Sequence, residues 1–176
     1  MTTKTRVVPV IKTTAFLIVF WSIFLFALPM GISVAEIEAG VQRFPPQPLL
    51  ASGLLLLATM LTVWAAFSFA ISGLGSPLTI DPPRELVTSG PYAYVRHPFV
   101  IGVIGQIVAL GIAVGSVPVI GYGAVILIVW YYGIRPGEER TLLNRFGESA
   151  RAYFQNVRGF RPRMTPYHGG PPTIGA

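Results

Sequence analysis

A short segment rich in polar and aromatic side chains, residues 90–98, carries the residue types best suited to chemistry. It reads Gly-Pro-Tyr-Ala-Tyr-Val-Arg-His-Pro and stands directly before a long apolar run. A guanidinium and an imidazole are costly to place in hydrocarbon, so Arg96 and His97 need a partner or a ligand there. A second polar cluster, Glu138 and Glu139, follows the last apolar run. A cationic and an acidic group at membrane edges predict one shared polar pocket at the lipid boundary.

The first cluster suits an anionic ligand. Arg96 could hold a carboxylate by two parallel hydrogen bonds. Pro98 begins the next predicted helix, and the N–H groups of a helix N-terminus favour negative charge. His97 could donate to a ligand or act as a base near neutral pH. The same residue types also suit an arginine that reaches out of the bilayer and a proline that simply starts a helix, so both interpretations stay open.

The second cluster suits a cationic ligand. A carboxylate at a membrane edge can bind an ammonium or a ribose diol, although two acids can also simply complement a helix dipole. Neighbouring helical residues point about 100° apart, so we expect only one of Glu138 and Glu139 to face a given pocket. The nearby aromatic residues are typical of an interfacial belt, and one of them could contact a ligand cation. They are Tyr92, Tyr94, Trp130, Tyr131 and Tyr132.

The composition excludes several classes of protein. The chain has 176 residues, of which 52% are hydrophobic and 11% charged, whereas soluble domains carry about 25% charged residues. We therefore expect an integral membrane protein in contact with membrane lipids. The formal net charge of +6 fits the cytoplasmic flanks of membrane helices better than a nucleic-acid partner. The chain has no cysteine and two histidines without an acidic spacing pattern, so we expect no metal site.

Four apolar runs are long enough to span or nearly span a bilayer. They cover residues 13–35, 49–71, 98–117 and 118–134, and a Gly-Ser-Val-Pro turn separates the last two. Lys and Arg concentrate on alternate sides of these runs, which predicts that both termini and the Arg96–His97 loop are cytoplasmic. A signal peptide cleaved after Ala35 is the less favoured alternative, because the apolar part is long.

The rest of the chain completes an all-α prediction. Residues 72–90 are rich in Gly and Pro and predict an irregular loop, whereas residues 138–157 have the spacing of an amphipathic surface helix that Gly147 could break. Residues 164–176 predict a disordered tail. We expect one domain over residues 1–163, a polytopic helical bundle of four spans plus a C-terminal amphipathic cytoplasmic helix. A fifth, re-entrant span is the alternative.

The two clusters together resemble a known family. The 90–98 motif, followed by Gly102, the glutamate pair and then Leu142, Phe146-Gly147, Tyr153 and Val157-Arg158, is similar to the isoprenylcysteine carboxyl methyltransferase and phospholipid methyltransferase superfamily. The resemblance covers residues 82–163. It implies a small helical membrane enzyme that uses S-adenosylmethionine, with a cofactor pocket beside the C-terminal helices. Carried over, the cofactor-site candidates are Tyr94, Arg96, His97, Pro98, Gly102, Glu138 and Glu139, with His97 and Arg96 as catalytic candidates.

Two positions depart from the family's pattern. The family usually has Tyr where this chain has Val100, and often has Tyr where this chain has Ala150. The contacts of those rings or hydroxyls are missing or replaced here. We expect the departures to affect the choice of substrate more than the cofactor.

The function predicted from these residues is methyl transfer from S-adenosylmethionine to a lipophilic or amphipathic acceptor. A prenylated cysteine carboxylate, a phospholipid amine, an isoprenoid and a small thiol all remain open as acceptors. If the acceptor is an amine, His97 is the first candidate for the general base. One alternative is a membrane reductase using NADPH, which predicts more basic residues for phosphates. The glutamate pair favours the sulfonium cofactor, and the polar clusters argue against a non-enzymatic scaffold or transporter subunit.

Overall fold

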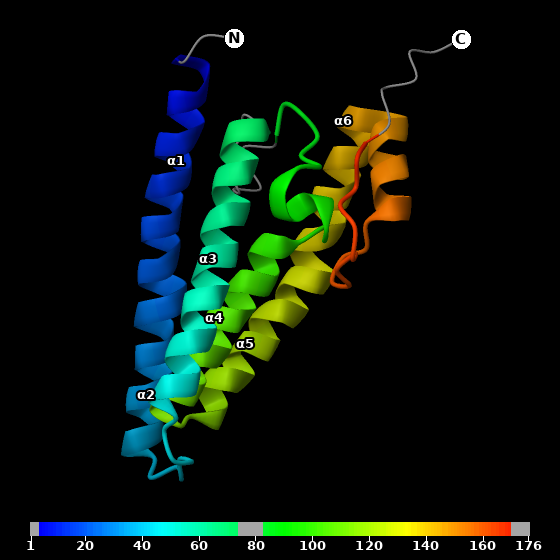
Figure 1. Ribbon diagram of the computed structural model, residues 1–176. Helices are drawn as coiled ribbons and strands as arrows, with labels where there is room; N and C mark the ends of the chain where they lie inside the picture. Colours follow the sequence, from blue (N-terminus) through cyan, green and yellow to red (C-terminus); the bar gives the residue numbers. More distant parts are fainter. Residues whose placement is uncertain (1–3, 74–82, 170–176) are drawn as a thin grey trace, which may run out of the picture.

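The computed structural model describes residues 4–73 and 83–169, and every regular element in those two ranges is helical. The chain folds into a bundle of long helices with both described ends at the same end of the molecule (Figure 1). The α-helices are α1 (Lys4–Phe20), α2 (Leu28–Glu38), α3 (Pro48–Ser72), α4 (Pro98–Val114), α5 (Val117–Val129) and α6 (Arg135–Asn156). Two π-helical turns and a 3₁₀ turn complete the elements: Trp21–Ala27, Trp130–Ile134 and Gly90–Ala93.

The π-helical turns join neighbouring helices without a break. The turn Trp21–Ala27 connects α1 to α2, and the turn Trp130–Ile134 connects α5 to α6. Three helical rods in the described ranges are long and apolar enough to cross a membrane: Val7–Glu38, Pro48–Ser72 and Val117–Asn156. α4 is a shorter apolar helix of 17 residues. The prediction of a helical membrane bundle is confirmed.

The predicted C-terminal amphipathic helix is α6, which follows the fourth apolar run without a break. Gly147, with φ of 50° and ψ of −121°, divides α6 into two helical segments across a kink, at the glycine that the sequence marks as a possible break. α6 carries seven charged side chains in its 22 residues, too many for hydrocarbon. The apolar part of this rod therefore ends at Ile134, and α6 extends it out of the membrane.

The turn between α4 and α5 requires a glycine. Gly115 has φ of 69°, and a Cβ there would lie 2.0 Å from the carbonyl oxygen of Phe44. Ser116 caps α5 by accepting a hydrogen bond at 3.0 Å from the N–H of Val119. This turn sets α4 and α5 antiparallel, as their spacing predicts.

Small residues let α3 and α4 pack closely. The buried positions of α3 are mostly alanines, and a Cβ added at Gly102 would lie 2.2 Å from the Oγ1 of Thr62. Close approach of small residues is the usual way that helices associate in a membrane. α3 and α4 therefore form the rigid centre of the bundle, and α4 carries the Arg96–His97 motif at its start.

The residues after α6 fold back along the motif. The N–H groups of Arg96 and His97 donate to the carbonyls of Arg158 and Gly159 at 3.0 and 3.3 Å. Further on, Tyr167 donates to the carbonyl of Ala93 at 2.9 Å. The tail predicted to be disordered from residue 164 therefore differs from the structure over residues 164–169, and the rest of it lies outside the described residues.

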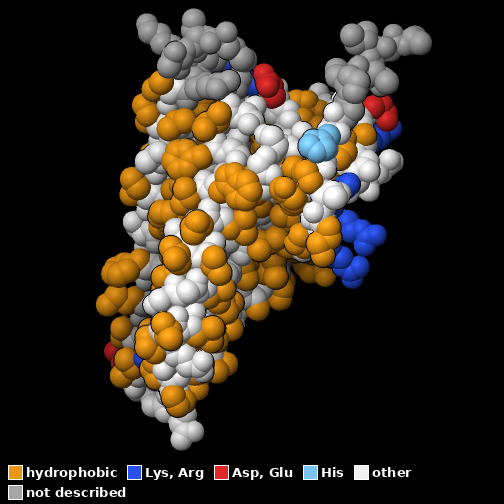
Figure 2. Space-filling view, in the orientation of Figure 1, with side chains coloured by type: hydrophobic (Ala, Val, Ile, Leu, Met, Phe, Trp, Pro, Cys, Tyr) orange, Lys and Arg blue, Asp and Glu red, His pale blue; other side chains and the backbone are white. Residues whose placement is uncertain are grey.

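Apolar side chains cover most of the visible surface along the long helices (Figure 2). Most charged side chains on this face gather towards the end that carries α6, which is the upper end in Figures 1 and 2. At the opposite end α2 lies close to α5, whereas α1 and α6 diverge (Figure 1). The helices are therefore closely packed in the lower half of the bundle and further apart in the upper half.

Candidate functional site

The 90–98 motif forms a compact corner at the upper end of α4. Gly90 starts the 3₁₀ turn with φ of 59°, and a Cβ there would lie 2.7 Å from the Oγ of Ser68 on α3. Pro98 occupies the first turn of α4, where its missing N–H costs nothing. The corner holds Arg96 and His97 between the start of α4 and the end of α6.

Arg96 joins two parts of the chain that are far apart in sequence. Its Nη1 donates to the Oε1 of Glu139 at 2.7 Å. Its Nε and Nη2 both donate to the carbonyl of Val157, at 3.1 and 2.8 Å, and Nη2 also donates to the carbonyl of Phe154 at 2.8 Å. The guanidinium lies over the ring of Phe154, 4.2 Å from its centroid. All three guanidinium nitrogens are thus bonded within the protein.

Glu139 is the centre of the ionic cluster. Its Oε1 also accepts from the Nε of Arg135 at 3.0 Å and lies 3.4 Å from the Nε2 of His97. Burial would raise the pKa of Glu139, but hydrogen bonds from His97, Arg135 and Arg96 outweigh burial and hold it at about 2. Glu139 is therefore ionised at every physiological pH, and it acts as a brace, which here means a group that holds its bonded neighbours in position.

The two predicted corners contact each other directly. We had expected Arg96 and the glutamates to hold opposite ends of one ligand, and the structure does bring them together. Because Arg96 and Glu139 bond to each other, however, neither has its charge free for a ligand. Their geometry favours a positioning role, in which they fix the neighbours that do face the pocket.

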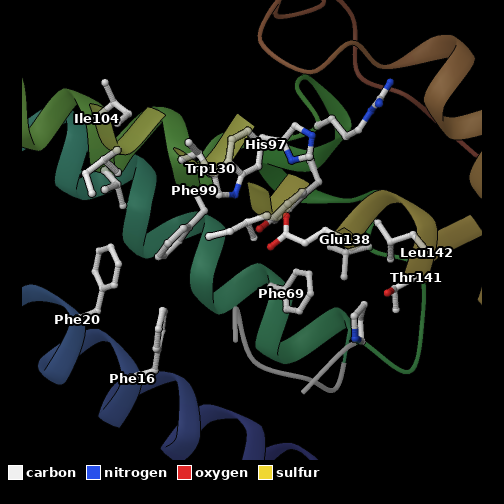
Figure 3. Close-up of a pocket in the computed structure, with 18 of the residues that line it drawn as sticks. Phe16, Phe20, Phe69, His97, Phe99, Ile104, Trp130, Glu138, Thr141 and Leu142 are labelled. Atoms are coloured by element: carbon white, nitrogen blue, oxygen red, sulfur yellow. The ribbon is translucent and has the colours of Figure 1, made fainter. Parts of the chain in front are cut away.

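Glu138 points the other way, into a cavity. Its side chain extends from α6 toward the space between His97 and Phe69 (Figure 3). Neither carboxylate oxygen of Glu138 has a hydrogen-bond or ion-pair partner among the described residues. Burial, and then the charge of Glu139, raises the pKa of Glu138 to about 7. The expectation that adjacent glutamates face different surroundings is met by this arrangement.

His97 also lines the cavity. Its ring packs edge-on against Trp130 with centroids 4.7 Å apart, and Phe160 lies 6.1 Å away. Burial lowers the pKa of His97, and the hydrogen bond with Glu139 only partly offsets this. The imidazole is therefore neutral at pH 7 and has the capacity to accept a proton.

The cavity has a volume of about 490 Å³ and changes character along its length. Its upper end holds the polar groups of Arg96, His97 and Glu138. Its lower part is apolar and passes between α1, α4 and α5. The apolar lining includes Phe16, Phe20, Phe24, Phe69, Phe99, Val100, Val103, Ile104, Ile126, Val129 and Trp130.

Several residues that line the cavity were not predicted from the sequence. Trp130 was assigned to an interfacial belt, yet it lies beside His97 and is 8% exposed. The signal was present, since Trp130, Ile134, Glu138 and Leu142 recur at four-residue spacing and all line the cavity. Phe16, Phe20 and Phe24 repeat that spacing on the first rod.

The remaining candidates lie outside the cavity lining. Tyr94 is 37% exposed, and its carbonyl accepts from the N–H of Arg163. Pro98 and Gly102 are buried in α4, with Gly102 against α3. Of the two departures, Val100 lines the cavity wall.

The cavity thus joins a polar corner to an apolar pocket inside a helical bundle whose helices include ones able to cross a membrane. A family model described as phospholipid methyltransferase matches residues 46–149. The chain belongs to the phospholipid methyltransferase family, which confirms the resemblance.

One curated relative is the cobalt-zinc-cadmium resistance protein CzcN of Cupriavidus metallidurans. It is 33% identical over 113 residues, which make up 64% of this chain and 48% of that protein. The chain thus spans about half the length of this relative. No solved structure matches the chain. Within the described ranges, no group of three or more His, Asp or Glu side chains is placed to hold a metal ion.

Proposed function

We propose that the protein transfers a methyl group from S-adenosylmethionine to a lipophilic acceptor that enters from the bilayer. One observation carries the proposal. The carboxylate of Glu138, without a partner among the described residues, faces a cavity that runs from a polar corner into an aromatic, membrane-level pocket. Such a cavity can hold a cationic cofactor and an apolar acceptor side by side.

The residues present fit this cofactor. When bound, S-adenosylmethionine supplies an electrophilic methyl group on a sulfonium. Glu138 would hold its ammonium, its sulfonium or its ribose diol, and the faces of Trp130 and Phe99 suit a cation. We assign Arg96, Glu139 and Arg135 to positioning, because they are bonded to one another. The apolar lining keeps water from the reacting atoms.

Two groups of this chain are placed to take a proton from the acceptor. Glu138 has a pKa of about 7, and His97 is neutral at that pH. A carboxylate without a neighbouring positive charge has a higher affinity for a proton, so Glu138 would be able to accept one at its free carboxylate oxygens. We therefore place Glu138 beside His97, the base first predicted, as a proton acceptor.

The charges of the cavity favour an acceptor that bears a proton, such as an amine or a thiol. Arg96 is the one permanent cation among the described lining residues, and its nitrogens are bonded elsewhere. The segment outside the description, residues 74–82, contains no Lys, Arg or His. A carboxylate acceptor would thus meet Glu138 without a compensating cation. The family's phospholipid amines fit this preference, and carboxylates are the alternative.

The charge distribution supports a cytoplasmic site. The described ends of the chain and the Arg96–His97 corner lie at one end of the bundle (Figure 1). The arginines that follow the last span lie in α6 and after it, at that same end. By the positive-inside rule, we expect this end to be cytoplasmic.

Calorimetric titration of the purified protein with S-adenosylhomocysteine, and separately with NADPH, tests the proposal. We expect S-adenosylhomocysteine to bind and NADPH not to. Glu138→Gln should weaken binding on the order of tenfold or more. Glu148→Gln makes the same change on an exposed part of α6 and should have no effect. Binding of NADPH alone would favour the reductase instead.

A further inference from the structure

The cavity closes abruptly in the middle of the bundle. On α5 the lining ends at Ile126, and on the first rod it ends at Phe24. Below this level α4 and α5 are in tight contact, because a Cβ added at Gly123 would lie 3.1 Å from the Cγ2 of Ile107. Ile107 and Val119 are fully buried there. The lining residues of the cavity on α4 and α5 all lie above this contact.

The backbone holds Phe24 at this level by an unusual arrangement. In the π-helical turn Trp21–Ala27, the N–H of Leu28 donates to the carbonyl of Ile23, five residues earlier. The next donor in that register would be residue 29, which is a proline without an N–H. The carbonyl of Phe24 therefore lacks its helical partner.

Tyr122 supplies the missing donor. Its hydroxyl donates to the carbonyl of Phe24 at 3.3 Å, across from α5 to the first rod. This bond joins the two walls of the cavity one turn below Ile126, the lowest lining residue of α5. Tyr122 thus fixes the position of Phe24 along the axis of the bundle.

The ring of Phe24 completes an aromatic wall. It stacks on Phe20 with centroids 4.7 Å apart, and Phe20 in turn lies 5.4 Å from Phe16 and 6.0 Å from Phe99. By contrast Phe26, in the same turn, is 66% exposed to the surroundings of the bundle. Only Phe24 of these two lines the cavity.

We propose that Phe24 sets the depth of the acceptor pocket, so that the site takes a single apolar chain about one leaflet long. From Glu138 to Ile126 is about 18 Å along a helix at 1.5 Å per residue. One leaflet of the hydrocarbon core is about 15 Å deep. The cavity of about 490 Å³ is within the usual range for a ligand site. Because its polar end takes part of this volume, the apolar part suits one chain better than two. That this apolar chain is part of the methyl acceptor rests on the proposed function.

A chain-length series tests the depth. Protein in lipid nanodiscs would be titrated with n-alkylamines and, separately, n-alkanols from octyl to eicosyl, against tritiated dodecylamine or dodecanol. When affinity is expressed per mole fraction of ligand in the lipid, we expect it to stay constant as the alkyl chain grows, up to a limiting chain length. Beyond that length the affinity should fall on the order of tenfold. The uncharged alkanols report on the chain without the polar corner.

Matched variants locate the limit. Phe24→Ala should move it to longer chains, Tyr122→Phe should move it in the same direction by less, and Phe26→Ala should leave it unchanged. An identical limit in all four proteins, or no limit, would overturn the proposal. Absence of any chain binding would overturn it too.

Calorimetry with S-adenosylhomocysteine separates this proposal from the proposed function. Retained cofactor binding in Phe24→Ala shows that the variant is folded and its polar corner intact. A failed depth limit with intact cofactor binding would remove the role of Phe24 alone. If the unaltered protein does not bind S-adenosylhomocysteine, the proposed methyl transfer is wrong, whatever the role of Phe24.

Discussion

Two adjacent carboxyl groups in α6 have opposite surroundings, and this difference assigns them different tasks. Glu139 is held ionised by two arginines and a histidine. Glu138 is half-buried in the cavity without a partner among the described residues, and its pKa is about 7. Divergent pKa values in neighbouring acids are typical of functional sites, because one group can brace while the other exchanges a proton.

The pKa of Glu138 predicts how cofactor affinity depends on pH. The carboxylate form binds a cation, so affinity should rise as pH increases through about 7 and then level off. From about pH 6 to about pH 8 the gain should be on the order of tenfold. His97, with its pKa lowered below the usual 6.5, stays neutral in this window, and Glu139 stays ionised. Burial raises the pKa of Tyr92, so it stays neutral too.

Titration of S-adenosylmethionine at several pH values measures this dependence. Glu138→Gln should give weaker binding that no longer changes through neutrality. A slope that persists in Glu138→Gln and disappears in His97→Gln would assign the proton to His97 instead.

Arg96 should behave as a brace in mutagenesis. Arg96→Ala leaves the carboxylate of Glu139 and the carbonyls of Phe154 and Val157 without their donor, which should cost about 2–4 kcal/mol of stability. A residue that only contacted the cofactor would weaken binding without lowering the melting temperature. Thermal unfolding with and without S-adenosylhomocysteine separates the two roles.

Arg151→Ala is the control for that measurement. Arg151 pairs with Glu148 on α6, and both side chains are mostly exposed, so its removal should change stability by less than about 1 kcal/mol. Equal melting temperatures for Arg96→Ala and the unaltered protein would contradict the brace.

At the scale of the elements, a second polar cluster holds the lower end of the bundle together. Glu36, which directly follows the first predicted span, is 4% exposed. Its Oε2 accepts from the Oγ of Ser116 at 2.5 Å and from the Nη2 of Arg43 at 3.3 Å. This cluster joins the end of α2, the loop that follows it and the start of α5.

Removal of the Glu36 carboxylate should therefore destabilise the protein without touching the cofactor site. Glu36→Ala leaves the half-buried guanidinium of Arg43 without its counter-ion and the buried hydroxyl of Ser116 without its acceptor. We expect a loss of about 2–4 kcal/mol. Glu38→Ala, on the same helix but exposed, should be close to neutral. Thermal unfolding measures the loss, and calorimetry at low temperature should show unchanged affinity for S-adenosylhomocysteine. A melting temperature equal to that of Glu38→Ala would contradict this role.

A substitution at Gly102 tests whether this glycine is needed for the close packing of α3 against α4. A Cβ there would lie 2.2 Å from the Oγ1 of Thr62 and 2.9 Å from the carbonyl oxygen of Ala58, so α3 and α4 would have to separate. Gly102→Ala should cost about 1–3 kcal/mol. Gly121→Ala, where nothing lies within 4 Å, should not. Equal unfolding temperatures would leave a direct role toward the cofactor as the alternative for Gly102.

The sequence predicted the elements better than the contacts between them. Apolar runs and glycines located the helices and the turn at Gly115, because these features act locally. The bond from Arg96 to Glu139 joins residues 43 positions apart, and no local pattern shows which of two glutamates will turn inward. The burial of Glu36 was missed for the same reason, since its partner Ser116 is 80 positions away. The wall that includes Trp130 was detectable from four-residue spacing.

At the scale of the whole molecule, the bundle has a closed half and an open half. The lower half is held by Glu36, by the glycine turn at Gly115 and by Tyr122. The upper half diverges and contains the cavity. This asymmetry suits an enzyme whose cofactor arrives from water and whose acceptor arrives from lipid, because the polar corner and the apolar pocket meet only at the open end.

Orientation in the membrane is the prediction that belongs to the whole chain. With the open end in the cytoplasm, a cysteine at position 168 should react with an impermeant maleimide only from the cytoplasmic side. A cysteine at position 39, in the loop at the closed end, should react only from the outside. The chain has no cysteine of its own, so each single variant reports one position without background.

Ala39→Cys and His168→Cys alter exposed residues that do not line the cavity, so both should still bind S-adenosylhomocysteine. Labelling of intact cells and of inverted vesicles gives the two sides. Labelling of both positions from one side would require an even number of spans between them. The opposite labelling pattern would place the cofactor site outside the cytoplasm, where S-adenosylmethionine made in the cell could not reach it, and the proposed methyl transfer would then lack its donor.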